Sequence, residues 1–488
     1  MKEWALQALD AVSRRGVTYA DVRAIEIRDR EISTKNGKSG HVSSSESVGL
    51  GIRVLAHGCW GFAATDELTR EGIDTAAALA LEIARAGTAA HKNDVSLAPE
   101  EKYETTWVAP FRIDPFSIPI DRQLAALLAV DAELRRQKEV SLAEASMHFE
   151  RRRQVFASTL GSLIDQTRCV SGAGFSALSY KNGEIQRRSY PNSFGGQYQI
   201  KGYELVEELK LLENAPRVAE EAVALHSADQ CPEGEFDLIL DSSQLGLQIH
   251  ESIGHPVELD RVLGTEANYA GMSFLTLNQL GRLRYGSDLV NVVCDARLEH
   301  GPGLGTFAFD DEGVPAQASD IIRHGQFVGF MTSRETAAQV GQSRSNGCMR
   351  ADGWGRLPLI RMTNVSLEPG SQSLEEVFDA GPSGSPAIYM ETNRSWSIDD
   401  KRFHFQFGCE IGWEMRHGKR VRMLKNPSYS GISTEFWNSC AAIAGRDHWT
   451  LWGVPNCGKG QPEQVMGTGH GASPARFRKI RIGSAYAA

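Results

Sequence analysis

Hydrophobic and polar residues follow one another in the first part of the chain in a way that predicts a sheet with helices packed on it. Residues 4–12 have the spacing of a short amphipathic helix, and apolar and charged side chains alternate through residues 22–34, which is typical of a strand. Two further strands are predicted for residues 48–55 and 60–64. An apolar stripe through residues 73–86, followed by a glycine, then predicts a helix.

A similar order of elements recurs after residue 100. It consists of a predicted helix over residues 121–137, strands within 141–158, 163–180 and 185–190, and a helix after Pro216. The pair Gly49 and Gly51 matches Gly172 and Gly174 at an offset of 123. We therefore hypothesise a degenerate duplication of two halves, residues 1–100 and 105–230. The alternative is that any two segments of mixed helix and strand look alike.

A small, polar, turn-forming stretch at residues 227–234 is the best boundary between domains. Residues 1–230 are predicted to form an N-terminal α+β domain with an antiparallel sheet and flanking helices. Beyond the boundary the chain is rich in glycine and in strand patterns, so residues 231–488 are predicted to form a mainly antiparallel β domain that carries one functionally important helix. The expected fold class is α+β.

That helix contains the strongest chemical signal, His250-Glu251-Ser252-Ile253-Gly254-His255. A histidine pair can bind a divalent metal, and a neighbouring carboxylate can take a proton from metal-bound water. Histidines five residues apart, however, lie about 140° apart around an ideal α-helix. A π-type widening to roughly 4.4 residues per turn would bring them within about 50°. Gly254 and Pro256 permit or force such a departure, so we predict one.

Two histidines do not complete a catalytic zinc site, which needs a third protein ligand. The candidates are Glu258, Asp260, Glu266, Asp310, Asp311, Glu312, Cys457 and His470. Most of these are expected to be solvated, and a solvated turn is the simplest interpretation of residues 310–312. Cys457 ranks first, because a thiolate suits zinc, its glycine-rich loop allows close approach and Lys459 would favour the thiolate. An inert structural cysteine is the alternative.

Composition, net charge and cysteine content limit the classes of protein to which the chain could belong. The chain has 488 residues, 41% of them hydrophobic, and a formal net charge of -9, which argues against an extended nucleic-acid-binding surface. No signal peptide and no apolar run of membrane-spanning length is evident, so a cytoplasmic protein is expected. The eight scattered cysteines form no C-x-x-C pair and are expected to be reduced thiols.

Several separated blocks resemble the TldD/TldE (PmbA) family, whose members have been described as modulators of DNA gyrase. The blocks are HESIGHPVELDR, GTEANYAGMSF, GTFAFDDEG, RMTNVSLEPG and NCGKGQP, in that order. The resemblance implies a zinc metallopeptidase of the TldD type that acts on unstructured peptides, with its site sheltered inside a dimer. It also implies that His250, His255 and Cys457 bind zinc. Partners of the TldE type lack the metal motif.

The favoured hypothesis is a zinc-dependent peptidase, in which zinc-activated water is the nucleophile and Glu251 is the general base. Its assembly would be a homodimer or a heterodimer with a TldE-like subunit. The alternatives are a non-catalytic binding or modulating protein with a structural metal site, and a metal-dependent hydrolase of another substrate. No residue that stabilises the oxyanion is evident, although His470 is considered.

Overall fold

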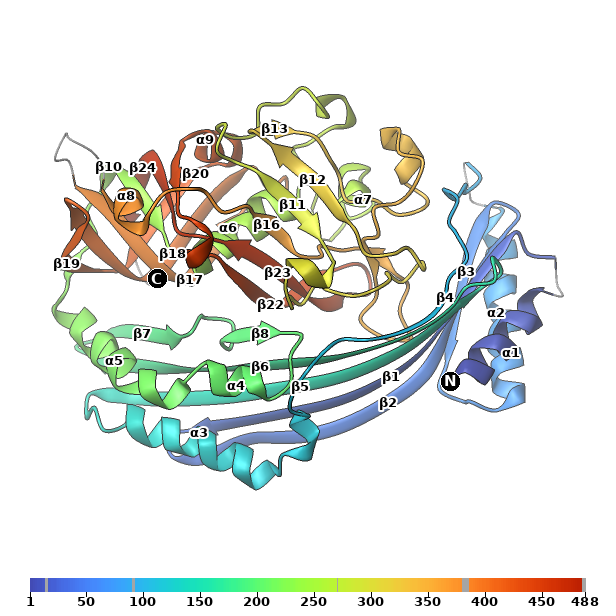
Figure 1. The fold of residues 1–488 in the computed structure, drawn as a ribbon, viewed down its shortest axis with the longest axis horizontal. Helices are drawn as coiled ribbons and strands as arrows, with labels where there is room; N and C mark the ends of the chain where they lie inside the picture. Colours follow the sequence, from blue (N-terminus) through green and yellow to red (C-terminus); the bar gives the residue numbers. More distant parts are fainter. Residues whose placement is uncertain (14–15, 90–92, 270, 380–385, 485–488) are drawn as a thin grey trace.

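The computed structural model describes residues 1–13, 16–89, 93–269, 271–379 and 386–484. It consists of a long curved sheet and a second unit, rich in short strands, that lies on the concave side of that sheet (Figure 1). No helix in the described part of the chain is long and apolar enough to cross a membrane.

The curved sheet has eight strands, in the order β3-β2-β1-β5-β6-β4, with β7 and β8 also paired to β6. The strands are β1 (Tyr19–Lys35), β2 (Lys38–Ala56), β3 (Cys59–Thr65), β4 (Glu104–Val108), β5 (Val140–Ser158), β6 (Leu163–Lys181), β7 (Glu184–Tyr190) and β8 (Gln197–Gln199). The pairing is antiparallel throughout except for β4 with β6. Strand β1 pairs with β2 and with β5 over almost its whole length, in a nearly regular register.

Helices cover one face of this sheet, at its two ends. They are α1 (Lys2–Ser13) and α2 (Arg70–Gly87) at one end, and α3 (Ile120–Leu134), α4 (Glu204–Glu208) and α5 (Leu211–Ala224) at the other (Figure 1). Because successive residues of a strand point to opposite faces, Val22 and Ala24 of β1 pack with α1 and α2. Asp21 and Arg23, which alternate with them, are buried on the other face, where Arg23 contacts Asp311 and Arg356 of the second unit.

The predicted α+β class is confirmed, and so are the predicted elements of the first sheet, with two shifted boundaries. Strand β2 begins ten residues before the prediction, because its first half is polar and exposed and shows no alternation. Helix α5 begins at Leu211 and contains Pro216 in its first half. The order of a helix and three antiparallel strands occurs twice, followed directly by α2 in the first half and by β8, α4 and α5 in the second. The duplication and the two domain boundaries stay predictions.

The second unit is built on another eight-stranded sheet, which closes on itself because β17 pairs with both β10 and β18. Its strands are β9 (Asp229–Gln230), β10 (Gly234–Leu240), β17 (Ala387–Ile398), β18 (His404–Arg416), β19 (Lys419–Lys425), β20 (Pro427–Ile432), β21 (Cys440–Ile443) and β24 (Ala475–Ser484). The α-helices of this unit are α6 (Ser242–Ile249), α7 (Leu259–Val262), α8 (Leu374–Phe378) and α9 (Ser433–Asn438).

Three smaller sheets complete the unit. They contain β11 (Val292–Asp295), β12 (Ala318–Arg323), β13 (Gln326–Phe327) and β16 (Val365–Leu367); β14 (Met349–Arg350) and β15 (Leu359–Ile360); and the hairpin of β22 (Thr450–Lys459) and β23 (Gln464–Ala472). A large apolar core joins α6 to strands of the closed sheet and of all three smaller sheets.

The contact between the two units corrects the interpretation of residues 310–312 as a solvated turn. All three side chains are buried. Asp310 accepts hydrogen bonds from main-chain N–H groups, Asp311 lies 3.6 Å from Arg23, and Glu312 accepts a 3.1 Å bond from Arg53. Arg53 also donates to Asp21 at 2.7 Å. Asp311 and Glu312 are therefore partners of arginines on the curved sheet, which the local sequence could not indicate.

Arg53→Ala is expected to destabilise the protein by about 3–5 kcal/mol, because Asp21 and Glu312 would stay buried without their cation. The measurement is urea denaturation followed by circular dichroism. The control is Arg136→Ala, which removes an exposed pair with Glu133 and should change stability little. Equal midpoints for the two variants would contradict the role given to Arg53.

Candidate metal centre

The two histidines of the motif lie on a π-helical turn that continues α6. Asp241 caps α6 by accepting hydrogen bonds from the N–H groups of Ser243 and Gln244. The turn spans His250–Gly254, and the N–H of His255 donates to the carbonyl oxygen of His250 at 3.1 Å. The widening predicted from the five-residue spacing is confirmed.

Tertiary contacts hold this turn in place. A Cβ on Gly254 would lie 2.1 Å from Sδ of the buried Met362, so glycine permits the close approach. The hydroxyl of Tyr285 donates to the carbonyl oxygen of Ser252, and Trp437 donates to the Ser252 hydroxyl at 2.9 Å. Buried partners thus satisfy polar groups of the widened turn, as its burial requires.

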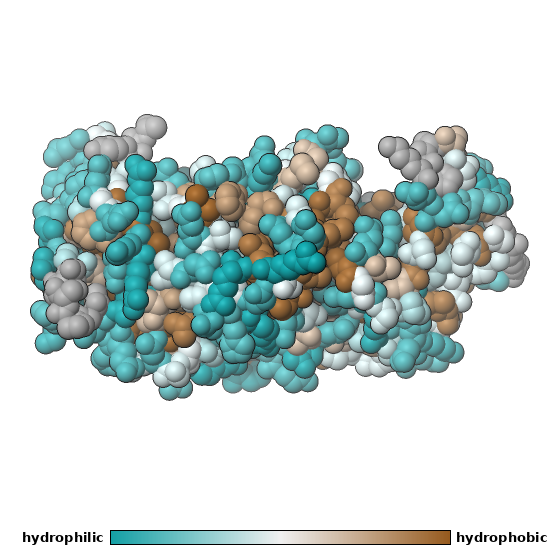
Figure 2. Space-filling view, turned by 90° about the horizontal axis from the view of Figure 1, so that it is seen from above, coloured by the Kyte–Doolittle hydropathy of each residue, from teal (hydrophilic) through white to brown (hydrophobic). Residues whose placement is uncertain are grey.

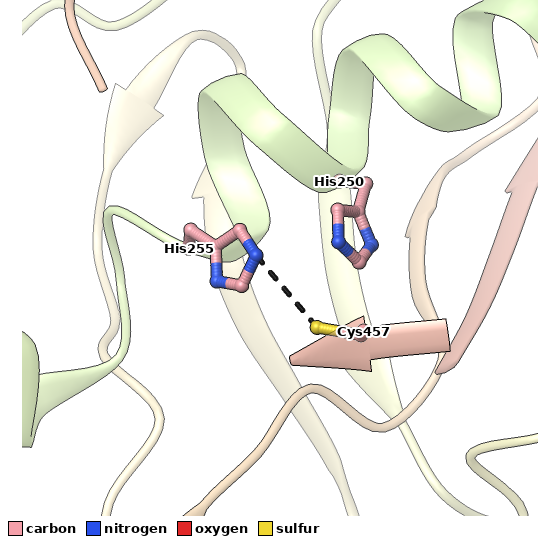
Figure 3. A group of neighbouring side chains, drawn as sticks. All are labelled: His250, His255 and Cys457. Atoms are coloured by element: carbon pink, nitrogen blue, oxygen red, sulfur yellow. Dashed lines mark hydrogen bonds between the residues drawn. The ribbon is translucent and has the colours of Figure 1, made fainter. Parts of the chain in front are cut away.

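The hairpin of β22 and β23 brings Cys457 to the histidines, although it lies some 200 residues further along the chain. Figure 3 shows the thiol of Cys457 directed at the His255 ring, with 3.7 Å between Sγ and Nε2. One donor atom from each of His250, His255 and Cys457 lies within 4.8 Å of the others. All three side chains are buried.

The hydrogen bonds of His250 and His470 determine which ring nitrogen of His250 carries the lone pair. Nδ1 of His470 lies 3.0 Å from the carbonyl oxygen of Val365, which can only accept, so Nδ1 carries the proton. Nε2 of His470 therefore accepts, and its partner at 2.8 Å is Nδ1–H of His250. This assignment leaves the lone pair of His250 on Nε2.

His255 is oriented in the same way by a carboxylate. Its Nδ1 donates to Oε2 of Glu258 at 3.0 Å, which leaves a lone pair on Nε2, the atom nearest to Cys457. Glu258 is fully buried between Arg261 and Lys459, at 3.2 and 3.4 Å. Burial raises the pKa of Glu258, but Lys459 and His255 outweigh it and hold that pKa well below its usual value. The carboxylate therefore stays charged.

The electrostatics favour metal-binding forms of all three donors. Burial lowers the pKa of His250 to about 4 and also lowers the pKa of His255, so both imidazoles are neutral near pH 7. Burial raises the pKa of the Cys457 thiol, but Arg361 and His255 outweigh it and the net shift is downward. Neutral imidazoles and a thiolate are the forms that metals bind. Lys459, which the sequence suggested for this role, instead pairs with Glu258 and Asp260.

The donor set fits zinc. Tetrahedral zinc with bonds of about 2.0–2.3 Å would hold its ligands roughly 3.3–3.8 Å apart. The 3.7 Å separation between Cys457 and His255 agrees with this spacing. The widest separation in the group, at most 4.8 Å, would have to close by about 1 Å.

Glu251 forms an ion pair with Arg402. Nη1 of Arg402 donates to Oε2 of Glu251 at 2.7 Å, and the Glu251 side chain is 7% exposed. Arg402 belongs to the turn between β17 and β18 and has a positive φ of 63°. No hydrogen bond from the described residues reaches Oε1 of Glu251, so this oxygen is available to another group.

The remaining sequence candidates lie around the donors and not among them. His470 backs His250, and Glu258 backs His255, while Asp260 accepts from Lys459 and Glu266 from the N–H of Gly460. The expectation that most were solvated is wrong for Glu258 and Glu266, which are buried. Sequence reasoning missed Arg402 and Arg361, because nothing in the local sequence links either residue to the motif.

Several named metalloproteases are similar to this chain, two of them over nearly its whole length. A metalloprotease of Methanothermobacter thermautotrophicus is 28% identical over 96% of both chains. A metalloprotease TldD homologue of Haemophilus influenzae is 24% identical over 98% of this chain and 95% of its own. A zinc metalloprotease TldD homologue of Saccharolobus solfataricus is 30% identical over 51% of this chain and 52% of its own.

Two solved structures have the same fold. A Thermotoga maritima protein, described as a proposed modulator of a DNA gyrase, matches with a TM-score of 0.77 at 16% identity and covers 99% of each chain. TldE of Thermococcus kodakarensis matches with a TM-score of 0.72 at 15% identity, over 98% of this chain and 100% of its own.

Two family models match directly. The model of the PmbA/TldA metallopeptidase C-terminal domain matches residues 233–484, more than half of the chain, and the model of domain 1 matches residues 20–84. The resemblance seen in the sequence is confirmed, and the chain belongs to the PmbA/TldD family of metallopeptidases.

Proposed function

We propose that this chain is a zinc-dependent peptidase that hydrolyses unstructured peptides, with zinc held by Nε2 of His250, Nε2 of His255 and the thiolate of Cys457. The observation that carries the proposal is the convergence of two neutral imidazoles and a thiol of lowered pKa beside a carboxylate. The metalloprotease names of relatives, one of them a zinc metalloprotease, support it.

Zinc bound there would supply Lewis-acid polarisation and lower the pKa of a coordinated water. Glu251 is the general base. Because Arg402 occupies Oε2, the proton of the attacking water goes to Oε1, and Glu251 can return it to the leaving amine. His470 and Glu258 keep the two imidazoles in the tautomer that offers Nε2.

The competing function is a non-catalytic modulating protein with a structural metal. Its support is the description of a structural relative as a proposed modulator of a DNA gyrase. Structural zinc sites are closed by four protein ligands, whereas catalytic sites have three. In the described part of the chain the donor group has three members, which favours catalysis.

Assembly and location are part of the proposal. A TldE-like structural relative supports a partnership of two such chains, homotypic or with a TldE-like subunit, and we propose the cytoplasm as the compartment.

Figure 2 shows apolar areas among the hydrophilic surface of one face. The exposed apolar side chains of the protein include Leu263, Met272 and Leu277, all in the segment that follows the metal motif. Exposed apolar side chains of this kind suit a protein contact.

Glu251→Gln is expected to keep zinc and to lose hydrolysis, by a factor of about 10² or more, because the amide cannot accept the proton. Zinc content and cleavage of a panel of unstructured peptides are measured together. Glu235→Gln, at an exposed position on β10, is the matched control and should keep full activity. A zinc-loaded wild type that cleaves none of the peptides would sink the proposal in favour of a structural metal.

Arg402→Ala is expected to lower kcat by roughly 10–100-fold with zinc content and KM little changed, because Glu251 loses the group that orients it. Added guanidinium should restore part of the rate, and Arg402→Lys should retain more activity than Arg402→Ala. Lys401→Ala, at the neighbouring exposed position, is the control. If guanidinium has no effect, or if the Lys401 variant loses as much, Arg402 has no positioning role.

A further inference from the structure

A second cluster of charged groups lies between the curved sheet and the second unit, outside the donor group described above. It surrounds a cavity of about 200 Å³. Arg152 of β5 and Arg168 of β6 line it from the curved sheet, and Arg350 lines it from the second unit. The same three arginines also line a smaller recess with Trp107 and Phe307.

Two of these arginines are held rigidly by groups that carry no net charge. Arg152 donates to the carbonyl oxygens of Ala351 and Asp352, at 2.9 and 3.2 Å. Arg350 donates to the carbonyl oxygens of Met362, Gly467 and Leu304, at 2.8 to 3.0 Å. Both side chains are buried, and neither has a carboxylate within 4.0 Å among the described residues.

Arg168 is the least satisfied of the three. Its nearest carboxylate is Glu150, 3.9 Å from Nη2, and its buried Nε has no hydrogen-bond partner. The other acidic groups around the space are engaged elsewhere, Asp311 with Arg23 and Gln154, and Asp352 with Arg356. Burial, and after it Arg168, lower the pKa of Arg350 to about 9, as expected of a cation whose charge is not compensated.

The cavity adjoins the hairpin that carries Cys457. Met466 lines it and lies directly opposite Cys457 in the pairing of β22 with β23. Thr468 and His470, two and four residues further along the same face of β23, contact His250. Opposed residues of paired strands are about 5 Å apart. A group in the cavity would therefore lie within a few residues of a peptide bond held at the metal centre.

We infer that this cavity is a carboxylate-binding site for the peptide, which receives its C-terminal carboxylate or an acidic side chain near the cleaved bond. The inference rests on the proposed function for the identity of the ligand. Buried charges in proteins are normally paired, and a guanidinium fork matches a carboxylate. Apolar neighbours such as Leu304, Met466 and Val170 would contact the aliphatic part of the bound residue.

The test measures peptide affinity by calorimetry on the zinc-loaded Glu251→Gln protein, which binds peptides without cleaving them. If the wild type itself cleaves nothing, the wild type is used instead. Three tetrapeptides are compared, namely a free acid, its C-terminal amide, and an amide with one internal glutamate. The free acid, the glutamate-containing amide or both should bind at least tenfold more tightly than the plain amide. Which of the two does so distinguishes a terminal carboxylate from a side chain.

Arg168→Gln should abolish this preference. The Arg168 guanidinium is the one of the three that no close partner from the described residues occupies, so it is free to bind a carboxylate. Arg168→Lys, which keeps the charge without the fork, should retain part of it. The matched control is Arg151→Gln, which makes the same charge change on the opposite face of β5, where Arg151 pairs with Asp114. It should leave the preference intact.

Equal binding of all three peptides, no binding of any, or a preference that survives Arg168→Gln would overturn the inference. Equal loss in the Arg151 variant would also overturn it. These outcomes are independent of hydrolysis. A wild type that binds the carboxylate and cleaves nothing would contradict the proposed function alone, while an active peptidase without the preference would contradict this inference alone.

Discussion

One hydrogen bond, from the N–H of His255 to the carbonyl oxygen of His250, is the constraint on which the centre depends. It closes a turn one residue wider than that of an α-helix and brings two side chains of unfavourable spacing to the same side. The widened turn is possible because Gly254 lies against Met362 and because buried Tyr285 and Trp437 bind polar groups of the turn. A regular helix here would move the two imidazoles apart, so that only one of them could lie near the Cys457 thiol.

Around this turn, each chemical group has a partner that orients it, and all of these partners except Glu258 come from a distant part of the chain. His470 on β23 backs His250, Glu258 and Lys459 back His255, and Arg402 from the turn after β17 holds Glu251. Burying so many charges is costly unless each is paired and hydrogen-bonded. The β22–β23 hairpin and the turn after β17 supply partners that the helix cannot supply itself.

The sequence predicted the structure best where neighbouring residues alone determine the conformation. Alternation predicted the strands of the curved sheet, and the spacing of His250 and His255 with Gly254 predicted the π-helical turn. It failed where the deciding contact is distant. The first half of β2 is polar and gives no periodic signal, Asp311 and Glu312 are buried against arginines on another sheet, and Arg402 meets Glu251 across 151 residues. Cys457 lies beside the histidines, and its role as a zinc ligand stays a prediction; Arg361 and His255, not Lys459, lower its pKa.

We propose that two imidazoles and one thiolate of this chain hold a zinc ion and leave one position for a non-protein ligand. X-ray absorption at the zinc edge, on the full chain and on Cys457→Ser, tests this proposal. The expected spectrum of the full chain shows two nitrogen neighbours from imidazole, one sulfur near about 2.3 Å and a further light atom, and the sulfur is lost in the variant. Four protein ligands, or a sulfur signal that is absent from the wild type or survives in Cys457→Ser, would contradict it.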